Sequence, residues 1–118
     1  MENFYKLEQK IVEFKFSMKI SASDSLELAK LILRFTHNYW ELSNSNIPHN
    51  EKCVYYALMS VLKKILDKKD KKNYTLKLNG SEYYALSSVL EYYHTKLLGD
   101  HKEAYTWIFS QRLLEKMA

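Results

Sequence analysis

The chain has 118 residues and a net charge of +4, and its composition excludes several classes of protein. Two glycines and one proline are too few for a loop-rich all-β fold or for low-complexity disorder. The longest apolar run, from Val54 to Met59, is far shorter than the roughly 20 residues of a membrane span. The single cysteine, Cys53, cannot form an internal disulfide, which is typical of proteins in a reducing compartment. We therefore expect a cytoplasmic protein that has no membrane partner.

Two segments alternate between apolar and polar residues, as half-buried β-strands do. The first runs from Val12 to Ile20 and the second from Tyr74 to Leu78. The first alternation predicts a strand, because a helix would scatter the same apolar residues around its axis. Residues 1–10 fit either a short helix or an extension of the sheet.

Three helix starts are marked by a polar residue with an acid three positions later, the spacing of a capping box. The pairs are Ser21 with Asp24, Asn79 with Glu82, and Asp100 with Glu103. Gly99, just before the last pair, is typical of the residue that ends a helix in the left-handed conformation.

The apolar spacing predicts four amphipathic helices, at about residues 22–42, 48–68, 80–98 and 101–117. Pro48 falls in the first turn of the second helix, where proline is tolerated. The residues expected to face inward from the first two helices are Leu26, Leu28, Ala29, Ile32, Leu33, Phe35, Tyr39, Trp40, Leu42, Val54, Leu58, Val61, Leu62, Ile65 and Leu66. Those expected from the last two are Leu86, Val89, Leu90, Tyr93, Leu97, Ala104, Trp107, Ile108, Leu114 and Met117. Cys53 is expected to be a small buried residue.

The two halves of the chain share a pattern. Residues 16–28 read FSMKISASDSLEL, residues 74–86 read YTLKLNGSEYYAL, and the two stretches align without a gap. Lys19 then meets Lys77, and the first two capping pairs coincide. Such internal similarity predicts a repeat of one strand–helix–helix unit. Convergence of both halves on a common strand, cap and helix pattern is the alternative.

We therefore predict a helix-dominated α+β fold in one domain, residues 1–118. The expected architecture is a β-α-α-β-α-α pseudo-repeat, with units at about 12–69 and 73–118. Its two strands would form a ribbon packed against the four amphipathic helices.

A two-stranded ribbon leaves both of its outer edges open, and open edges can pair with another chain. The first strand is also expected to be longer than the second, which would leave its Val12–Phe14 end unpaired. We therefore expect a homodimer or higher homo-oligomer that joins edges into a larger sheet. The alternative is a monomer in which the N-terminal segment or a loop covers the edge.

The clearest charged feature is a basic cluster in the segment 63–72, which holds six lysines and two aspartates. Its lysines are Lys63, Lys64, Lys68, Lys69, Lys71 and Lys72. They indicate either a phosphate contact for nucleic acid or an ordinary helix end, where lysines offset the negative end of the helix dipole. Arginine, which binds phosphate and guanine bidentately, is nearly absent, and this favours the helix end.

Tyrosine is unusually frequent, with ten residues, and three adjacent pairs lie in the predicted helices. Because neighbouring helical residues point about 100° apart, one ring of each pair can face the core and the other the rim. Rim aromatics suit protein interfaces and ligand clefts. The candidate binding residues are Tyr55, Tyr83, Tyr92, Trp40 and His37. An ordinary packing role is the alternative.

No motif for catalysis or metal binding is present. His49 and Cys53 share a helix face, but a structural zinc site needs four ligands and the sequence offers no second pair. We therefore expect no enzyme, no cofactor and no metal. The leading hypothesis is a homo-oligomeric module that binds a protein partner or a small ligand through tyrosine-rich surfaces. The alternatives are a nucleic-acid-binding protein that uses the basic cluster and an enzyme that uses His37 or His94.

Overall fold

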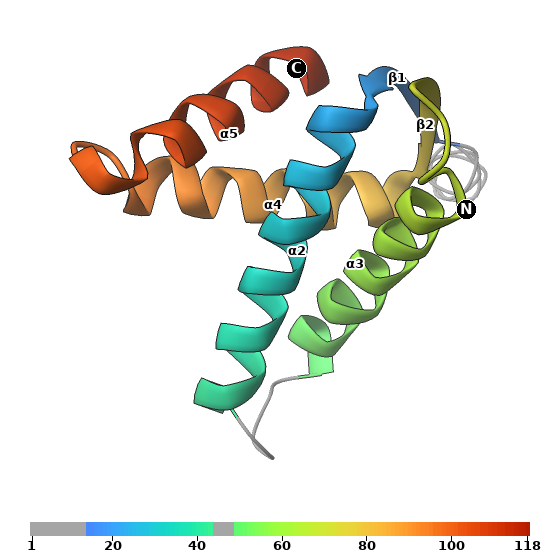
Figure 1. Ribbon diagram of the computed structural model, residues 1–118. Helices are drawn as coiled ribbons and strands as arrows, with labels where there is room; N and C mark the ends of the chain where they lie inside the picture. The colour runs from blue at the N-terminus through green and yellow to red at the C-terminus, as the bar shows by residue number, and fades with distance from the viewer. Residues whose placement is uncertain (1–13, 44–48) are drawn as a thin grey trace.

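A computed structural model of the protein describes residues 14–43 and 49–118, and the side chains of residues 14–37 and 52–118. The chain forms two successive strand–helix–helix units (Figure 1). The first unit comprises β1 (Lys15–Ser21), α2 (Ala22–Ser43) and α3 (His49–Asp67). The second comprises β2 (Asn73–Asn79), α4 (Gly80–Lys96), the short 3-10 turn η2 (His101–Glu103) and α5 (Ala104–Met117). The predicted helix-dominated α+β fold is confirmed.

The two strands pair antiparallel over their full length. The side chains of Met18 and Ile20 on β1 and of Leu76 and Leu78 on β2 are buried. The polar residues between them point to the other side of the ribbon, because side chains alternate along a strand. One face of the ribbon is therefore apolar and covered by the helices, and the other is polar.

The prediction that the first strand is longer than the second is wrong, because each strand has seven residues. Lys15 pairs with Asn79, where β2 ends and α4 begins, so the ladder stops at this point. Phe14 precedes the strand and is exposed. Val12 and residues 1–10 lie outside the described residues.

The register of the ribbon relates the two units by a pseudo-two-fold axis. Met18 and Leu76 are counterparts in the gapless alignment of the two halves, and they pair with each other. Ile20 pairs with Tyr74, and Phe16 pairs with Leu78, so each strand meets the other in the order that two-fold symmetry requires. The burial pattern along the two strands is also nearly the same.

The predicted capping boxes form to different extents. At the start of α4 the box is complete: the Asn79 side chain accepts from the Glu82 amide at 2.8 Å, and the Glu82 carboxylate accepts from the Asn79 amide at 2.9 Å. At the start of α2, the Ser21 hydroxyl accepts from the Asp24 amide at 3.1 Å. The Asp24 carboxylate accepts a hydrogen bond from Arg112 of α5 at 2.7 Å.

The last predicted box is replaced by a tighter turn. Asp100 accepts from the Lys102 amide, and the next residues form η2, so α5 begins later than predicted. The Glu103 carboxylate accepts two hydrogen bonds from the Arg34 guanidinium, each 3.1 Å long. Gly99 has a φ of 81°, the left-handed conformation that glycine adopts without steric cost.

One hydrophobic core joins the two helical hairpins to the inner face of the ribbon. Figure 1 shows α2 with α3, and α4 with α5, as two hairpins that meet beside the strands. Phe35 on α2 packs edge to face against Tyr92 and Tyr93 on α4, with ring centroids 5.5 and 6.3 Å apart. The largest fully buried side chains include those of Ile20, Leu28, Ile32, Leu58, Leu76, Leu86, Leu90 and Leu113.

Three leucines expected to be buried are exposed. Leu26 and Leu33 on α2 and Leu66 on α3 lie on helix faces turned away from the core. A helix buries only the stripe that meets its neighbours, and in α2 this stripe passes through Leu28 and Ile32. The prediction that Cys53 is buried is also wrong, because this residue is exposed. Tyr39 and Leu42 lie outside the described side chains.

The buried face of α5 is shifted relative to the prediction. Phe109, Leu113 and Met117, spaced four apart, are buried, whereas Ala104 and Ile108 are exposed. The helix carries apolar residues on more than one side, so spacing alone does not decide which side faces α4. Packing decides it.

This shift can be tested by two neighbouring substitutions. We expect Phe109→Ala to lower the free energy of unfolding by about 3 kcal/mol, because its ring is 3% exposed and leaves a cavity. Ile108→Ala, at a side chain 57% exposed, should cost less than about 1 kcal/mol. Urea unfolding of the two variants measures the difference, and equal losses would contradict the assignment of the buried face.

Candidate nucleic-acid interface

The polar side of the ribbon, which we call the outer ribbon face, carries eight side chains. They are those of Lys15, Ser17, Lys19, Ser21, Asn73, Thr75, Lys77 and Asn79. All are exposed except Ser21, which is partly buried. Three are lysines, the others are hydroxyls and amides, and none is acidic. This face is therefore positively charged and rich in hydrogen-bonding groups.

Aromatic packing supports one end of the ribbon from the inside. The Tyr83 ring on α4 lies against Phe14 and Phe16, with centroids 5.3 and 5.0 Å apart. The Tyr83 hydroxyl donates to the backbone carbonyl of Met117 at the end of α5. Tyr83, a predicted binding residue, therefore joins β1, α4 and α5 inside the fold.

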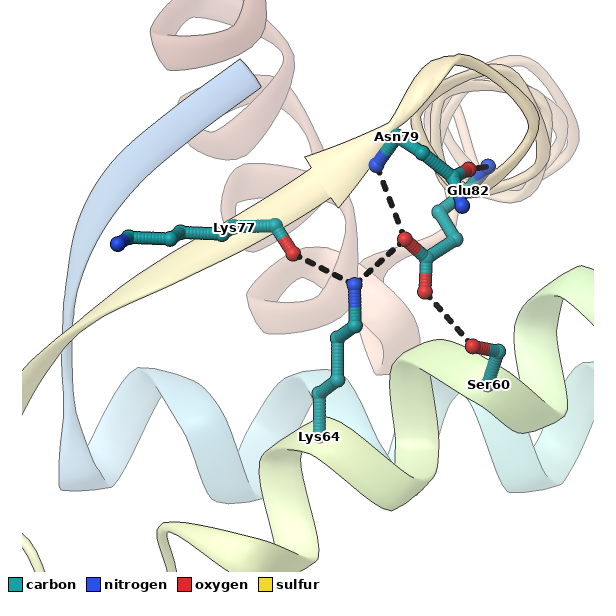
Figure 2. A network of polar contacts seen from close by, with 5 residues as sticks. All are labelled: Ser60, Lys64, Lys77, Asn79 and Glu82. Atoms are coloured by element: carbon teal, nitrogen blue, oxygen red, sulfur yellow. Dashed lines mark hydrogen bonds and ion pairs between the residues drawn. The ribbon is translucent and has the colours of Figure 1, made fainter. Parts of the chain in front are cut away.

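An ion pair fixes α3 to the edge of β2, an arrangement we call the α3 bracket (Figure 2). The Lys64 ammonium lies 2.6 Å from the Glu82 carboxylate and donates to the Lys77 carbonyl at 2.9 Å. The Ser60 hydroxyl donates to the other Glu82 oxygen at 2.8 Å. Glu82 is 1% exposed, so its bonds to Lys64 and Ser60 replace bonds that water would make to the carboxylate.

The ionised form of Glu82 is stabilised in this position. Burial opposes ionisation, but the Asn79 amide, the Lys64 ammonium and the Ser60 hydroxyl together outweigh it and hold the pKa of Glu82 below its ordinary value. The side chain that caps α4 therefore also binds α3. One carboxylate fixes three elements at the edge of the ribbon.

The other strand has a related arrangement, the α5 bracket. Lys116 of α5 donates to the Lys19 carbonyl at 3.3 Å, and Arg112 of α5 pairs with Asp24 at 2.7 Å. In the alignment of the two halves, Lys19 is the counterpart of Lys77 and Asp24 is the counterpart of Glu82. Two basic side chains of α5 thus make the contacts that Lys64 makes alone. The brackets obey the same pseudo-two-fold symmetry as the ribbon.

The brackets bear on the expected homodimer. A strand that paired with the edge of β2 would compete with Lys64 for the Lys77 carbonyl, and one that paired with β1 would compete with Lys116. Lysine side chains at sheet edges commonly prevent such pairing. Edge-to-edge association therefore stays a prediction, and the brackets oppose it.

The basic cluster divides into two parts. Lys64 is held by Glu82, whereas Lys63, Lys68, Lys69, Lys71 and Lys72 are exposed, as are Asp67 and Asp70. The Ala22 amide donates to the Lys72 carbonyl at 2.7 Å, which ties the loop after α3 to the end of β1. The loop lysines, which are Lys68, Lys69, Lys71 and Lys72, therefore lie next to the Ser21–Asn73 end of the ribbon and extend the positive charge of the outer ribbon face.

The other candidate binding residues lie on three helices, α2, α3 and α4. Tyr55 is partly buried beside Tyr56. Tyr92 lies at the rim, where its hydroxyl accepts from Lys96 at 2.8 Å. His37 is exposed, and Trp40 lies outside the described side chains. The tyrosine-rich binding surface therefore stays a prediction.

A small cavity of about 80 Å³ lies between α2 and α5. Its lining consists of Glu27, Lys30, Leu31, Arg34, Tyr105, Thr106 and Phe109, which includes none of the candidate binding residues. Arg34, one of the lining residues, forms an ion pair with Glu103. We assign no ligand to it.

The described residues contain no group of three or more histidines, cysteines or acids that could hold a metal ion. The His94 ring stacks on Trp107, and burial raises the pKa of Tyr93 to about 12, so this hydroxyl stays protonated at neutral pH. None of the helices described is long and apolar enough to cross a membrane.

The sequence reasoning did not recognise the outer ribbon face as a candidate site. The signal was present, because the polar positions of both predicted strands contain lysines, hydroxyls and amides and no acid. Only the pairing of β1 with β2 shows that these positions form one surface. Comparison with protein-family models, with curated proteins and with solved structures found no significant match to this chain.

The α3 bracket can be tested with two adjacent lysines. We expect Lys64→Met to lower the free energy of unfolding by about 2 kcal/mol, because buried Glu82 loses its counter-charge. Lys63→Met, at the exposed neighbouring position, should cost less than about 0.5 kcal/mol. Urea unfolding at neutral pH measures both values.

The same pair of variants should show a defined pH dependence. Because the pKa of Glu82 is lowered in the fold, its stabilisation is present above the unfolded pKa of about 4.3 and is lost as the pH falls through the folded value. The difference between wild type and Lys64→Met should therefore shrink in acid. A difference that stays constant into strong acid would contradict the ion pair.

Proposed function

We propose that the protein binds double-stranded DNA and places the outer ribbon face in the major groove. The groove of B-form DNA is about 12 Å wide and admits a two-stranded β-ribbon. The observation that carries the proposal is the composition of this face: eight outward side chains, three of them lysines and none acidic.

A solvated outer face is ordinary in an antiparallel sheet, so exposure alone supports nothing. The charge distribution is what supports DNA binding. The chain contains 14 acidic residues, and none of them lies at the outward positions of either strand. A surface that excludes acids while it carries lysines attracts a polyanion.

The side chains of this face also suit the edges of base pairs. Lysine donates to the acceptors of guanine, asparagine pairs with adenine, and serine and threonine hydroxyls contact several bases. Lys19, Lys77, Ser17, Thr75 and Asn73 are of these types and are exposed. The face can therefore contribute sequence preference as well as charge.

The exposed lysines of the loop supply a complementary contact. They lie beside the end of the ribbon, because the Lys72 carbonyl is bonded to the Ala22 amide. With the ribbon in the groove, side chains at its end reach the adjacent phosphates, which position a protein on the duplex. In this proposal the basic cluster is an accessory contact and the ribbon is the principal one.

A second candidate is association with another protein through the helices. Leu26 and Leu33, which lie seven residues apart on α2, are each more than half exposed. A spacing of seven residues places both leucines on one face of the helix, where they can contact an apolar surface of another protein. A second copy of the chain or another protein could bind there without disturbing the ribbon.

DNA binding can be tested by neutralising the lysines of the outer ribbon face. We expect the triple variant Lys15→Gln, Lys19→Gln, Lys77→Gln to weaken binding to a B-form duplex at least tenfold, about 1.4 kcal/mol. The control variant Lys30→Gln, Lys96→Gln, Lys102→Gln removes the same charge from exposed helix and turn positions and should change affinity much less. Fluorescence anisotropy over a range of salt concentrations measures both.

Two results would contradict the proposal. One is the absence of duplex binding by the wild type even at low salt. The other is an equal loss of affinity in both triple variants, which would indicate a general charge effect. Double-stranded RNA serves as a further control, because its narrow major groove does not admit the ribbon and binding should be weaker.

A further inference from the structure

Some side chains of the outer ribbon face have a chemically similar counterpart across the pseudo-two-fold axis, and others do not. We infer that the protein recognises an approximate inverted repeat in DNA, alike in both halves at the inner positions and different at the outer ones. This inference rests on the proposed DNA binding and adds the form of the target. The two-fold symmetry of a DNA-binding protein is generally mirrored in its site.

The inner positions carry matching side chains. Lys19 and Lys77 are counterparts, and Ser17 and Thr75 are counterparts that each carry a hydroxyl. In the ribbon, Ser17 pairs with Lys77 and Lys19 pairs with Thr75, so the same two groups flank the pseudo-two-fold axis on both sides. The two inner half-sites should therefore be alike, each with a guanine accessible to lysine.

The ends of the ribbon differ from each other. Lys15 and Asn79 form one end, and Ser21 and Asn73 form the other. The Asn79 side chain accepts from the Glu82 amide and the Ser21 hydroxyl from the Asp24 amide, so both are engaged as helix caps. The outer contacts are thereby left to Lys15 at one end and Asn73 at the other.

These two residues differ in the base they prefer. Lysine donates to the guanine O6 and N7 acceptors, whereas the asparagine amide can both donate to and accept from adenine. One half of the site should therefore prefer guanine at its outer position and the other half adenine. The loop lysines at the Asn73 end add a phosphate contact on the adenine side.

The covalent link between the two units sets the stoichiometry. Both strands of the ribbon belong to one chain, so one molecule presents both half-site surfaces. A duplex with a single site should therefore bind one protein chain. No association between chains is required for recognition.

Selection of binding sites from random duplexes tests the inference. The wild type should enrich an inverted repeat with unequal outer positions, and replacing the preferred outer base should weaken binding about tenfold. Asn73→Lys should make guanine preferred at both outer positions, and Lys15→Asn should make adenine preferred at both. Both residues are exposed, and circular dichroism checks that the variants fold.

The outcomes separate this inference from the proposed function. Tight duplex binding with no enriched repeat, or with a repeat that Asn73→Lys leaves unchanged, would overturn the inference and leave DNA binding intact. Two chains on one site would also overturn it. No duplex binding in the anisotropy titration would reject the proposed function, and this inference with it.

Discussion

The fold depends on the pairing of β1 with β2 about Met18 and Leu76. Two strands are too few to form a stable sheet in water, so the ribbon exists only because its apolar side is buried by the helices. Burial of Ile20 and Leu78 on the same side fixes the register, since a slip by one residue would turn every side chain over. The polar residues of both strands are thereby forced onto a single outer face.

The two brackets hold the helices against the edges of this ribbon. Lys64 and Lys116 each donate to a strand carbonyl, and the two carbonyls belong to the counterparts Lys77 and Lys19. The edges are therefore occupied by the protein's own side chains, which opposes association through added strands. The outer ribbon face stays exposed, and it combines side chains of β1 and β2, one strand from each unit.

Prediction of the fold from the sequence was correct where the signal was local. Alternation identified both strands, and the Asn79 box marked the start of α4. It failed where the outcome depends on packing: spacing could not tell whether Phe109 or Ile108 faces the core, and the partner of Lys64 lies 18 residues away. Most of the candidate site was visible only as isolated polar positions, because joining them requires the strand pairing.

The outer ribbon face is positively charged, carries side chains that can bind the edges of base pairs, and is held in place by buried contacts. These properties favour its insertion into a DNA groove. An NMR titration of the labelled protein with a short B-form duplex tests this most directly. The largest amide shift changes should map to residues 15–21 and 73–79, with smaller ones at 68–72. Binding that shifts only helical residues and leaves both strands unchanged would contradict it.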